Sequence, residues 1–397
     1  TKLQDVGQAL TDFKTSGKKI IAVADQYSQD QYYLASYADD VWLTPGGWLI
    51  LDGYGRYQMY FKSALEKLNI TQHVFRVGTF KSAVEPYIRN DMSDEAKLAN
   101  EQWLNDLWTV YKTDVAKQRE FKLDNFDETF DAIVAKLEKA DGDFSQYALD
   151  NNFVDALKTR EEVRTELAGI VGKTENGSYH HIGFNDYLKS IKPPFPMVNP
   201  ITDKVAIVVA KGTILDGHKS PGTIGGDSTA ALLRKARLDD KVKAVVLRID
   251  SGGGSMFASE VIRAEVLALK AAGKPVIASM SSVAASGGYW IASAANEIWA
   301  APSTITGSIG VFGTFMTFEN TMAELGIYSD GVATTDLAGF SIARPLDEKM
   351  SDIIQMSVEN AYKRFLNVVA EARNMTPEQV DKIAQGRVWI ATQAKDL

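Results

Sequence analysis

The sequence contains no cysteine among its 397 residues. Disulfide bonds, thiol catalysis and cysteine-based zinc sites are therefore excluded. Histidine is scarce, with four residues, and so is proline, with 11. Long apolar runs are also missing: Val205–Ala210 is typical of the longest, and a bilayer span needs about 20 apolar residues. We see no signal peptide at the N-terminus.

Hydrophobic residues make up 45% of the chain and charged residues 24%, which is typical of a globular protein with a substantial core. The length suits two or three domains. The net charge is −8 and no long basic run occurs, so nucleic acid is not an expected partner.

An internal repeat organises the chain. Tyr32–Ile70 aligns with Tyr289–Ile327 without a gap at an offset of 257, and 11 of the 39 columns are identical, among them Trp42 with Trp299. Self-similarity of this kind indicates duplication of one structural unit. The register also places Thr1 opposite Phe257, so we expect the first copy to be incomplete at its N-terminus and the second at its C-terminus.

Each copy alternates short apolar runs with helical patterns. Pro275–Met280 and Glu297–Ala300 are interpreted as strands buried on both faces, and Val261–Lys270 has helical apolar spacing. Further strands are expected at Lys204–Val209 and Val242–Ile249. This alternation predicts an α/β fold of two fused repeats of stacked βαβ units.

Domain boundaries follow from composition. The stretch 193–202 is rich in proline and predicts a linker between an N-terminal repeat, 1–192, and a C-terminal repeat, 203–397. Met92–Lys139 is helical in pattern and rich in tryptophan, leucine and charge. We interpret it as a helical extension that serves packing rather than a site.

Ser286 lies in the most informative stretch, Gly273–Gly313. An apolar strand leads into the small residues AASGG, and a helix opens at Tyr289. A serine there lies beside free backbone N–H groups at a helix N-terminus, where an oxyanion would be stabilised. The same pattern also fits an ordinary serine helix cap. The local sequence does not choose between nucleophile and cap.

A second glycine-rich segment, Arg248–Ser255, follows a strand and precedes a helix. It lacks the Lys-Ser/Thr ending of a phosphate-binding P-loop. It fits a tight turn equally well. Together with Ser286 it fits a second oxyanion donor and a bed for an extended peptide.

A nucleophilic serine needs a base. The four histidines are His73, His180, His181 and His218, and none has a partner at a telling position for a Ser-His-Asp triad. Lys81, in GTFKSAVEP, follows a strand and has apolar neighbours. Burial would lower its pKa and make it a base, whereas most lysines are solvated surface charges.

The motifs AASGGYW, S-x-GGS and GTFKSAVEP together resemble the signal peptide peptidase A family, also called protease IV. The resemblance covers essentially the whole chain in order. It implies a Ser–Lys peptidase with a fold related to Clp protease and crotonase, two fused repeats in its long members, and no metal or other cofactor. Matched residue by residue, it implies Ser286 as nucleophile and Lys81 as general base. It also implies oxyanion-hole N–H groups at Gly287 and Gly254, and a hydrogen bond from Ser308 to the lysine.

One position departs from the family pattern: Gly252 stands where these proteins usually have proline. The change is expected to loosen the loop without affecting the two glycines that follow.

The repeat supports a split site. The column of Ser286 holds Gln29 or Asp30 in the first copy, and the column of Lys81 holds Ala338 or Gly339 in the second. Each copy keeps one member of the pair, so we expect one site per chain, formed between the two repeats.

The resemblance further implies the biological setting. The expected substrates are signal peptides left after protein export and similar extended apolar peptides. The expected assembly is a homo-tetramer with inward-facing sites. It would sit on the periplasmic side of the bacterial inner membrane, held by an N-terminal anchor absent from this chain.

Two other functions remain open. A crotonase-like acyl-CoA enzyme would share the fold and oxyanion hole but need no Ser–Lys pair. A non-catalytic scaffold would leave Lys81 and Ser286 far apart.

Overall fold

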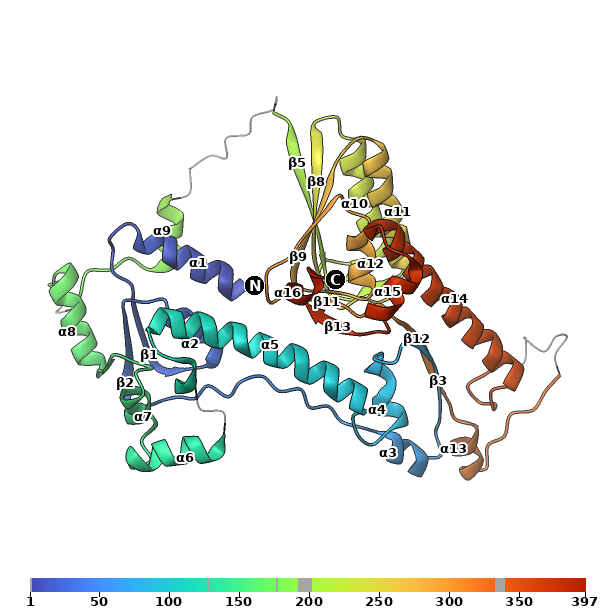
Figure 1. Cartoon of the computed structure of the whole chain (residues 1–397), viewed down its shortest axis with the longest axis horizontal. Coiled ribbons are helices and arrows are strands. Elements are labelled where there is room, and N and C mark those ends of the chain that lie inside the picture. Colours follow the sequence, from blue (N-terminus) through green and yellow to red (C-terminus); the bar gives the residue numbers. More distant parts are fainter. Residues whose placement is uncertain (1, 127–128, 176–177, 192–201, 333–339) are drawn as a thin grey trace. The chain divides into compact units, whose positions relative to one another are not determined.

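A computed structural model describes residues 2–126, 129–175, 178–191, 202–332 and 340–397. The predicted linker 193–202 lies outside the described residues except for Thr202. The chain forms two compact units (Figure 1). The first comprises 55–107 and 203–397, and the second comprises 2–54 and 108–202. We call them the site unit and the N-terminal unit.

The site unit is built on a mixed sheet with strand order β13-β11-β9-β8-β5, with β10 beside β9. All pairs are parallel except β11 with β13. The strands are β5 (Lys204–Lys211), β8 (Val242–Ser251), β9 (Val276–Ala285), β10 (Glu297–Trp299), β11 (Ile305–Gly307) and β13 (Val388–Ile390). The predicted strands are thus present, and β9 continues to the residue before Ser286.

Helices α10 (Gly226–Leu238), α11 (Met256–Ala271) and α12 (Gly287–Ser293) pack against this sheet. Their apolar side chains join those of β8 and β9 in one buried cluster. The expectation of strands buried on both faces is wrong for β10, whose Trp299 is 62% exposed. Strand β10 is an edge strand that pairs with β9 alone in the described sheet. Its first and last residues, Glu297 and Trp299, are exposed.

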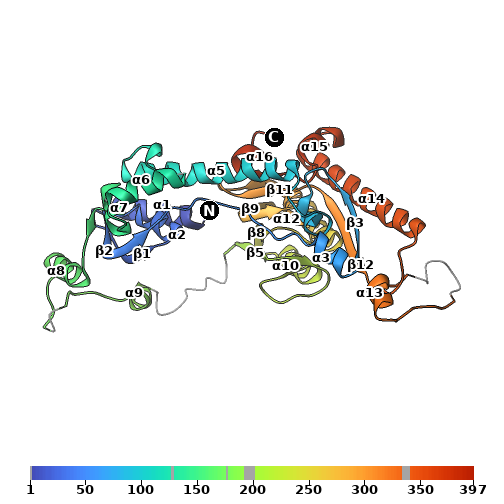
Figure 2. The same ribbon diagram turned by 90° about the horizontal axis from the view of Figure 1, so that it is seen from below.

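A two-stranded antiparallel ribbon joins residues from the two sequence repeats inside the site unit. Strand β3 (Thr71–Val77) pairs along its whole length with β12 (Val311–Thr317). Figure 2 shows the two strands side by side. The chain after β3 then continues into Lys81, a short 3-10 turn (Ser82–Val84) and α4 (Glu85–Ile88).

The C-terminal helices complete this unit. Helix α14 (Glu348–Arg373) contributes Phe365 and Val369 to a second buried cluster with Trp290 and Ile309. Helix α15 (Pro377–Ile383) ends at a tight turn that leads into β13, and α16 (Ala391–Ala394) follows.

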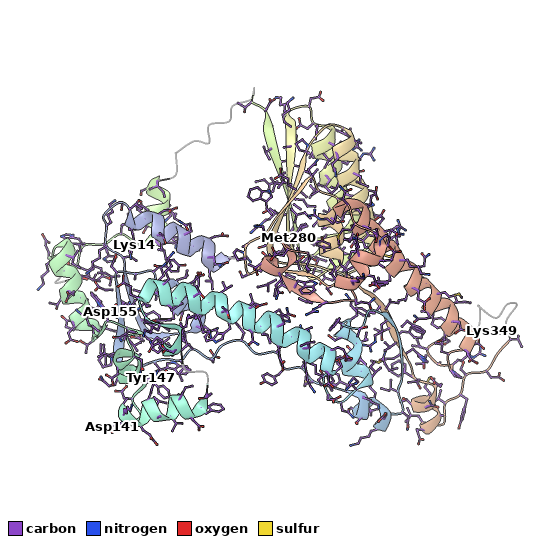
Figure 3. The ribbon with its side chains drawn as sticks, viewed as in Figure 1. Lys14, Asp141, Tyr147, Asp155, Met280 and Lys349 are labelled. Atoms are coloured by element: carbon purple, nitrogen blue, oxygen red, sulfur yellow. The ribbon has the colours of Figure 1, made fainter. Side chains whose placement is uncertain are left out.

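The N-terminal unit has a three-stranded parallel sheet of β1 (Ile21–Tyr27), β2 (Asp40–Leu49) and β4 (Ala156–Leu157). Its aromatic-rich core includes Tyr147 and Phe153. Asp155, labelled with Tyr147 in Figure 3, accepts hydrogen bonds from the Val41 N–H and the Arg119 guanidinium. The helices of this unit are α1 (Lys2–Lys14), α2 (Gln29–Ala35), α6 (Phe130–Lys139), α7 (Phe144–Asp150), α8 (Arg160–Val171), α9 (Phe184–Ile191) and the second part of α5 (Asp94–Arg119).

The sequence repeat reappears in the elements. Helix α3 (Lys62–Lys67) and α13 (Glu319–Glu324) both have 6 residues and stand at the predicted offset. Helices α5 and α14 follow in the same order, with 26 residues each. The compact units nevertheless divide the chain differently from the repeats. Residues 55–107 of the first copy belong to the site unit because β3 pairs with β12.

Candidate active site

Ser286 stands at the junction of β9 and α12 in a strained backbone conformation. Its φ is 54° and ψ is −122°, in a region that residues with a side chain seldom adopt. The Ser286 N–H donates to the Gly307 carbonyl at 2.8 Å, which holds this conformation. The side chain makes no capping hydrogen bond to α12. The helix-cap alternative is therefore wrong, and the hydroxyl is available for another partner.

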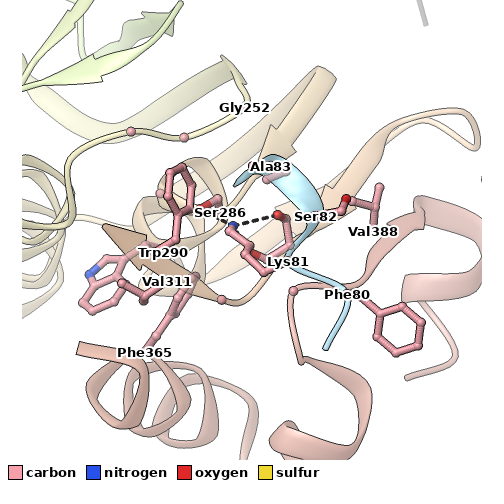
Figure 4. Close-up of a pocket in the computed structure, with 18 of the residues that line it drawn as sticks. Phe80, Lys81, Ser82, Ala83, Gly252, Ser286, Trp290, Val311, Phe365 and Val388 are labelled. Carbon is pink, nitrogen blue, oxygen red and sulfur yellow. Dashed lines mark hydrogen bonds between the residues drawn. The ribbon is translucent and has the colours of Figure 1, made fainter. Parts of the chain in front are cut away.

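That partner is Lys81. Its ammonium nitrogen Nζ lies 3.3 Å from Ser286 Oγ (Figure 4). The same nitrogen lies 3.0 Å from Ser308 Oγ and 3.1 Å from the Ser308 carbonyl oxygen. The residue is only 6% exposed, so the surface-lysine alternative is wrong. The scaffold alternative expected Lys81 and Ser286 to lie far apart. Their contact shows that this expectation is also wrong. Ser308, like Ser286, has a positive φ, 53°.

Burial lowers the pKa of Lys81 from 10.5 to about 8. The cause is desolvation, which disfavours the charged ammonium. Among the described residues no carboxylate forms an ion pair with Lys81 to oppose this effect. Roughly a tenth of the amine is then neutral at pH 7, and most of it at pH 9. Proteins obtain a lysine base in this way.

The glycine-rich loop after β8 packs against Ser286. A Cβ on Gly253, whose φ is +102°, would approach Ser286 Cβ to 2.8 Å, and one on Gly254 would lie 2.0 Å from the Ile214 carbonyl oxygen. Only glycine fits at either position. A Cβ on Gly252 would meet nothing within 4 Å, and its φ is not positive. Gly252 is thus the one glycine of the three that a side chain could replace.

Two backbone donors converge beside Ser286. The N–H groups of Gly254 and Gly287 donate to no acceptor within the described ranges, although the neighbouring Gly253 and Ser255 N–H groups do. An ideal Cβ on Gly287 would lie 3.3 Å from the Gly254 nitrogen, so the two backbones are in close contact. Unpaired donors beside a nucleophile can stabilise an oxyanion.

A cavity of about 760 Å³ opens over these groups. Its apolar walls include Met256, Trp290, Val311, Phe312 and Phe365. The first turns of α5 contribute Ala96 and Ala99, so the interpretation of 92–139 as packing alone is incomplete. Sequence reasoning missed these wall residues because an apolar side chain in a helix or strand has no local signal that distinguishes a cavity wall from ordinary packing.

The histidines take no part in this site. All four lie in described segments, and none lines the cavity. The ring of His73, on β3, lies 2.9 Å from Thr317 Oγ1, and burial lowers the pKa of His73. His218 Nδ1 stands 3.7 Å from Asp227 Oδ2 on the exposed surface.

The described segments contain no group of three or more histidine, cysteine, aspartate or glutamate side chains arranged to hold a metal ion. They also contain no helix with the length and apolar character that a membrane crossing requires.

The turn Gln385–Arg387 was not singled out by its sequence, yet it touches both the Lys81 loop and the Ser308 strand. The only local signal is Gly386 shortly after a helix, which indicates a helix end and nothing about catalysis.

The fold and site together define an α/β protein in which a serine at a strand–helix turn is paired with a buried lysine. The model of Peptidase family S49 matches residues 12–172 and 268–397. The chain therefore belongs to peptidase family S49. The two matched segments agree with the two sequence copies.

Curated relatives extend over nearly the whole chain. Protease 4 of Salmonella typhi is 48% identical over 392 residues, covering 98% of this chain and 62% of that protein. Protease 4 of Haemophilus influenzae is 45% identical, covering 99% and 64%. The chloroplastic serine protease SPPA of Arabidopsis thaliana is 28% identical, covering 99% and 58%. The chain thus spans less than two thirds of the length of these relatives.

Among solved structures, a mutant ClpP1 from Listeria monocytogenes is 16% identical, with a TM-score of 0.31. The match covers 48% of this chain and 85% of that one.

Proposed function

We propose that the site unit carries the active centre of a serine endopeptidase that uses a Ser–Lys dyad. The observation that carries the proposal is the 3.3 Å contact between Ser286 Oγ and the buried Lys81 Nζ. Membership of family S49 supports peptidase chemistry over acyl-CoA chemistry. A crotonase-like enzyme would also give no reason to bury a lysine against the serine.

The dyad works through the neutral amine. A neutral lysine has two N–H donors and one lone pair. With the two donors directed at the oxygens of Ser308, the lone pair is directed at Ser286 and can accept its hydroxyl proton. Ser308 therefore acts as the orienting residue for Lys81.

Catalysis then follows the usual course of acyl transfer. As Lys81 takes the proton, Ser286 Oγ attacks the peptide carbonyl carbon, and the oxyanion is held by the N–H groups of Gly287 and Gly254. The Lys81 ammonium protonates the leaving amine, and the C–N bond breaks to leave an acyl-serine ester. Neutral Lys81 next activates a water molecule that hydrolyses the ester.

The substrates we propose are remnant signal peptides and other extended apolar peptides. The apolar walls of the cavity, which include Trp290 and Phe365, support a preference for substrates with apolar side chains. From the family resemblance we also propose a homo-tetramer at the periplasmic side of the inner membrane. Sedimentation velocity on the full-length protein measures the subunit count.

The test is hydrolysis of an apolar peptide ester from pH 6 to 10. We expect Ser286→Ala and Lys81→Ala to lose at least about a thousandfold in kcat, because the two groups act as a unit. Lys97→Ala, which removes an exposed lysine on α5, should match the parent. Parent activity should rise with pH through about 8, since Lys81 must lose its proton.

A fluorophosphonate probe gives an independent readout, with labelling expected at Ser286 in the parent and absent in Ser286→Ala. Retained activity in Lys81→Ala would place the base elsewhere and reject the dyad.

A further inference from the structure

A three-residue turn, Gln385–Gly386–Arg387, contacts both the loop that carries Lys81 and the backbone at Ser308. We call it the bridging turn. The Gln385 carbonyl accepts the Phe80 N–H at 2.8 Å, one residue before Lys81. The Gly386 N–H donates to the Ile309 carbonyl at 2.8 Å, and the Arg387 carbonyl accepts the Ser308 N–H at 2.6 Å. One turn therefore holds both the lysine loop and the serine that orients the lysine.

The side chain of Gln385 adds two further contacts. Its Oε1 accepts the Thr79 N–H at 3.2 Å, and its Nε2 donates to Asp381 Oδ1 at 2.5 Å. The Tyr362 hydroxyl donates to the same carboxylate oxygen and accepts the Gln385 N–H. Gln385 has a φ of 52°, a conformation that costs of order 1 kcal/mol for a residue with a side chain. Hydrogen bonds to both its backbone and its side chain therefore hold Gln385 in place.

The fit around the lysine backbone is close. A Cβ on Gly386 would lie 2.7 Å from the Lys81 nitrogen and 2.8 Å from its Cβ. A Cβ on Gly78 would lie 2.7 Å from the Gln385 carbonyl. The absence of both side chains lets the two backbones touch, so a shift of the bridging turn is transmitted directly to Lys81.

We infer that Gln385 is a positioning residue for Lys81, holding the loop 78–81 so that the buried amine stays in contact with Ser286 and Ser308. The inference rests on the proposed function. Lysine has a long flexible stem, and its amine stays at one place only if its backbone is fixed and its surroundings exclude water. A loosened loop admits water, and hydration favours the ammonium form.

Charged groups around the loop do not replace this role. Arg76 Nη1 donates to the Lys81 carbonyl at 3.4 Å and stands 3.8 Å from Glu85. The Arg387 guanidinium lies 5.3 Å from the Phe80 ring centroid. Asp381 faces Gln385 rather than the amine. These groups contact the backbone or neighbours of Lys81, while the amine itself contacts only Ser286 and Ser308 among polar partners in the described chain.

The test compares Gln385→Met with the parent and with Gln355→Ala. Methionine keeps the length and unbranched shape of the Gln385 side chain but removes both of its hydrogen bonds. Gln355 is a partly exposed glutamine of α14 whose side chain donates to Glu359, remote in sequence from the Lys81 loop, so it serves as the matched control. For Gln385→Met we expect kcat to fall about tenfold with KM within twofold. Its pH profile should shift toward alkaline pH by at least half a unit.

A parent-like profile and kcat in Gln385→Met would overturn the inference.

A readout without catalysis keeps this outcome distinct from failure of the proposed function. The pH dependence of Lys81 acylation by acetic anhydride, followed by mass spectrometry, reports the pKa of the amine directly. The pKa of the Lys81 amine should rise in Gln385→Met and not in Gln355→Ala, whether or not the parent cleaves peptides. An unchanged acylation profile together with reduced kcat would make Gln385 merely structural.

Discussion

Lys81 is a residue whose burial works against stability. Its amine is removed from water with no carboxylate partner among the described residues, and its remaining polar contacts are neutral serine oxygens. Strain at Ser286 and Ser308 adds to the same local cost. Such groups are retained where function requires them.

Replacing Lys81 by methionine should therefore stabilise the protein while abolishing activity. The folded-state pKa, about 8, lies below the unfolded value of 10.5, so the charged form is disfavoured in the folded state. Below pH 8 the penalty is fully present, and it disappears as pH rises through 10.5. The lowered pKa corresponds to roughly 3 kcal/mol, reduced by lost hydrogen bonds, so we expect a gain of about 1–2 kcal/mol at pH 7.

Urea denaturation at pH 7 and pH 10.5 measures this, with exposed Lys97→Met as control. The advantage of Lys81→Met should shrink at the higher pH. A variant less stable than the parent at pH 7 would contradict the argument.

Sequence reasoning reached Ser286 and Lys81 at the residue level because each sits in a recognisable motif. It left the cap and surface alternatives open, since local sequence carries no information on burial. Gln385 escaped notice because its role depends on Thr79 and Asp381, one of them far away in the chain.

At the scale of elements, the β3–β12 ribbon positions the loop that contains Lys81 beside Ser286. The ribbon begins at Thr71 paired with Thr317 and ends at Val77 paired with Val311, and the lysine loop follows directly. The activity of the site should therefore fall when the pairing of β3 with β12 is destabilised.

Phe75 provides the test of that dependence. It is buried on β3, and its ring stacks on Phe315 at a centroid distance of 6.1 Å. Phe75→Ala should destabilise the protein by about 3 kcal/mol, because it leaves a cavity in the ribbon's packing. It should also lower kcat through a less ordered Lys81 loop. Leu68→Ala, at an exposed leucine next to α3, should change stability by less than about 0.5 kcal/mol. Equal effects of the two substitutions, measured by thermal unfolding and kinetics, would argue against the ribbon's role.

At the scale of the whole molecule, each compact unit has its own buried core. The clusters around Ile262 and Phe365 lie in the site unit, and the aromatic cluster around Phe153 lies in the N-terminal unit. A separate core gives each unit its own source of cooperative stability.

Phe153→Ala should therefore act on one unit only. Phe153 is 2% exposed among Tyr32, Phe121 and Tyr147, and its truncation should cost about 3–5 kcal/mol. Hydrogen exchange should accelerate in β1 and β2, while β8 and β9 keep the parent's protection. Ile262→Ala, in the core of the site unit, should give the reverse pattern. Equal loss of protection in both units after either substitution would show that they unfold together.

By itself, the sequence determined the repeat, the α/β alternation and four strands of the sheet, β5, β8, β9 and β10. The alternation and the strands depend on residues close together in the chain, through apolar periodicity. The sequence also excluded cysteine chemistry outright. Only the tertiary structure decided that Lys81 is buried, that the Ser286 side chain does not cap α12 and that the turn Gln385–Arg387 contacts the lysine loop. Lys81 and Ser286 are 205 positions apart, and the pairing of β3 with β12 that unites them has no local signature.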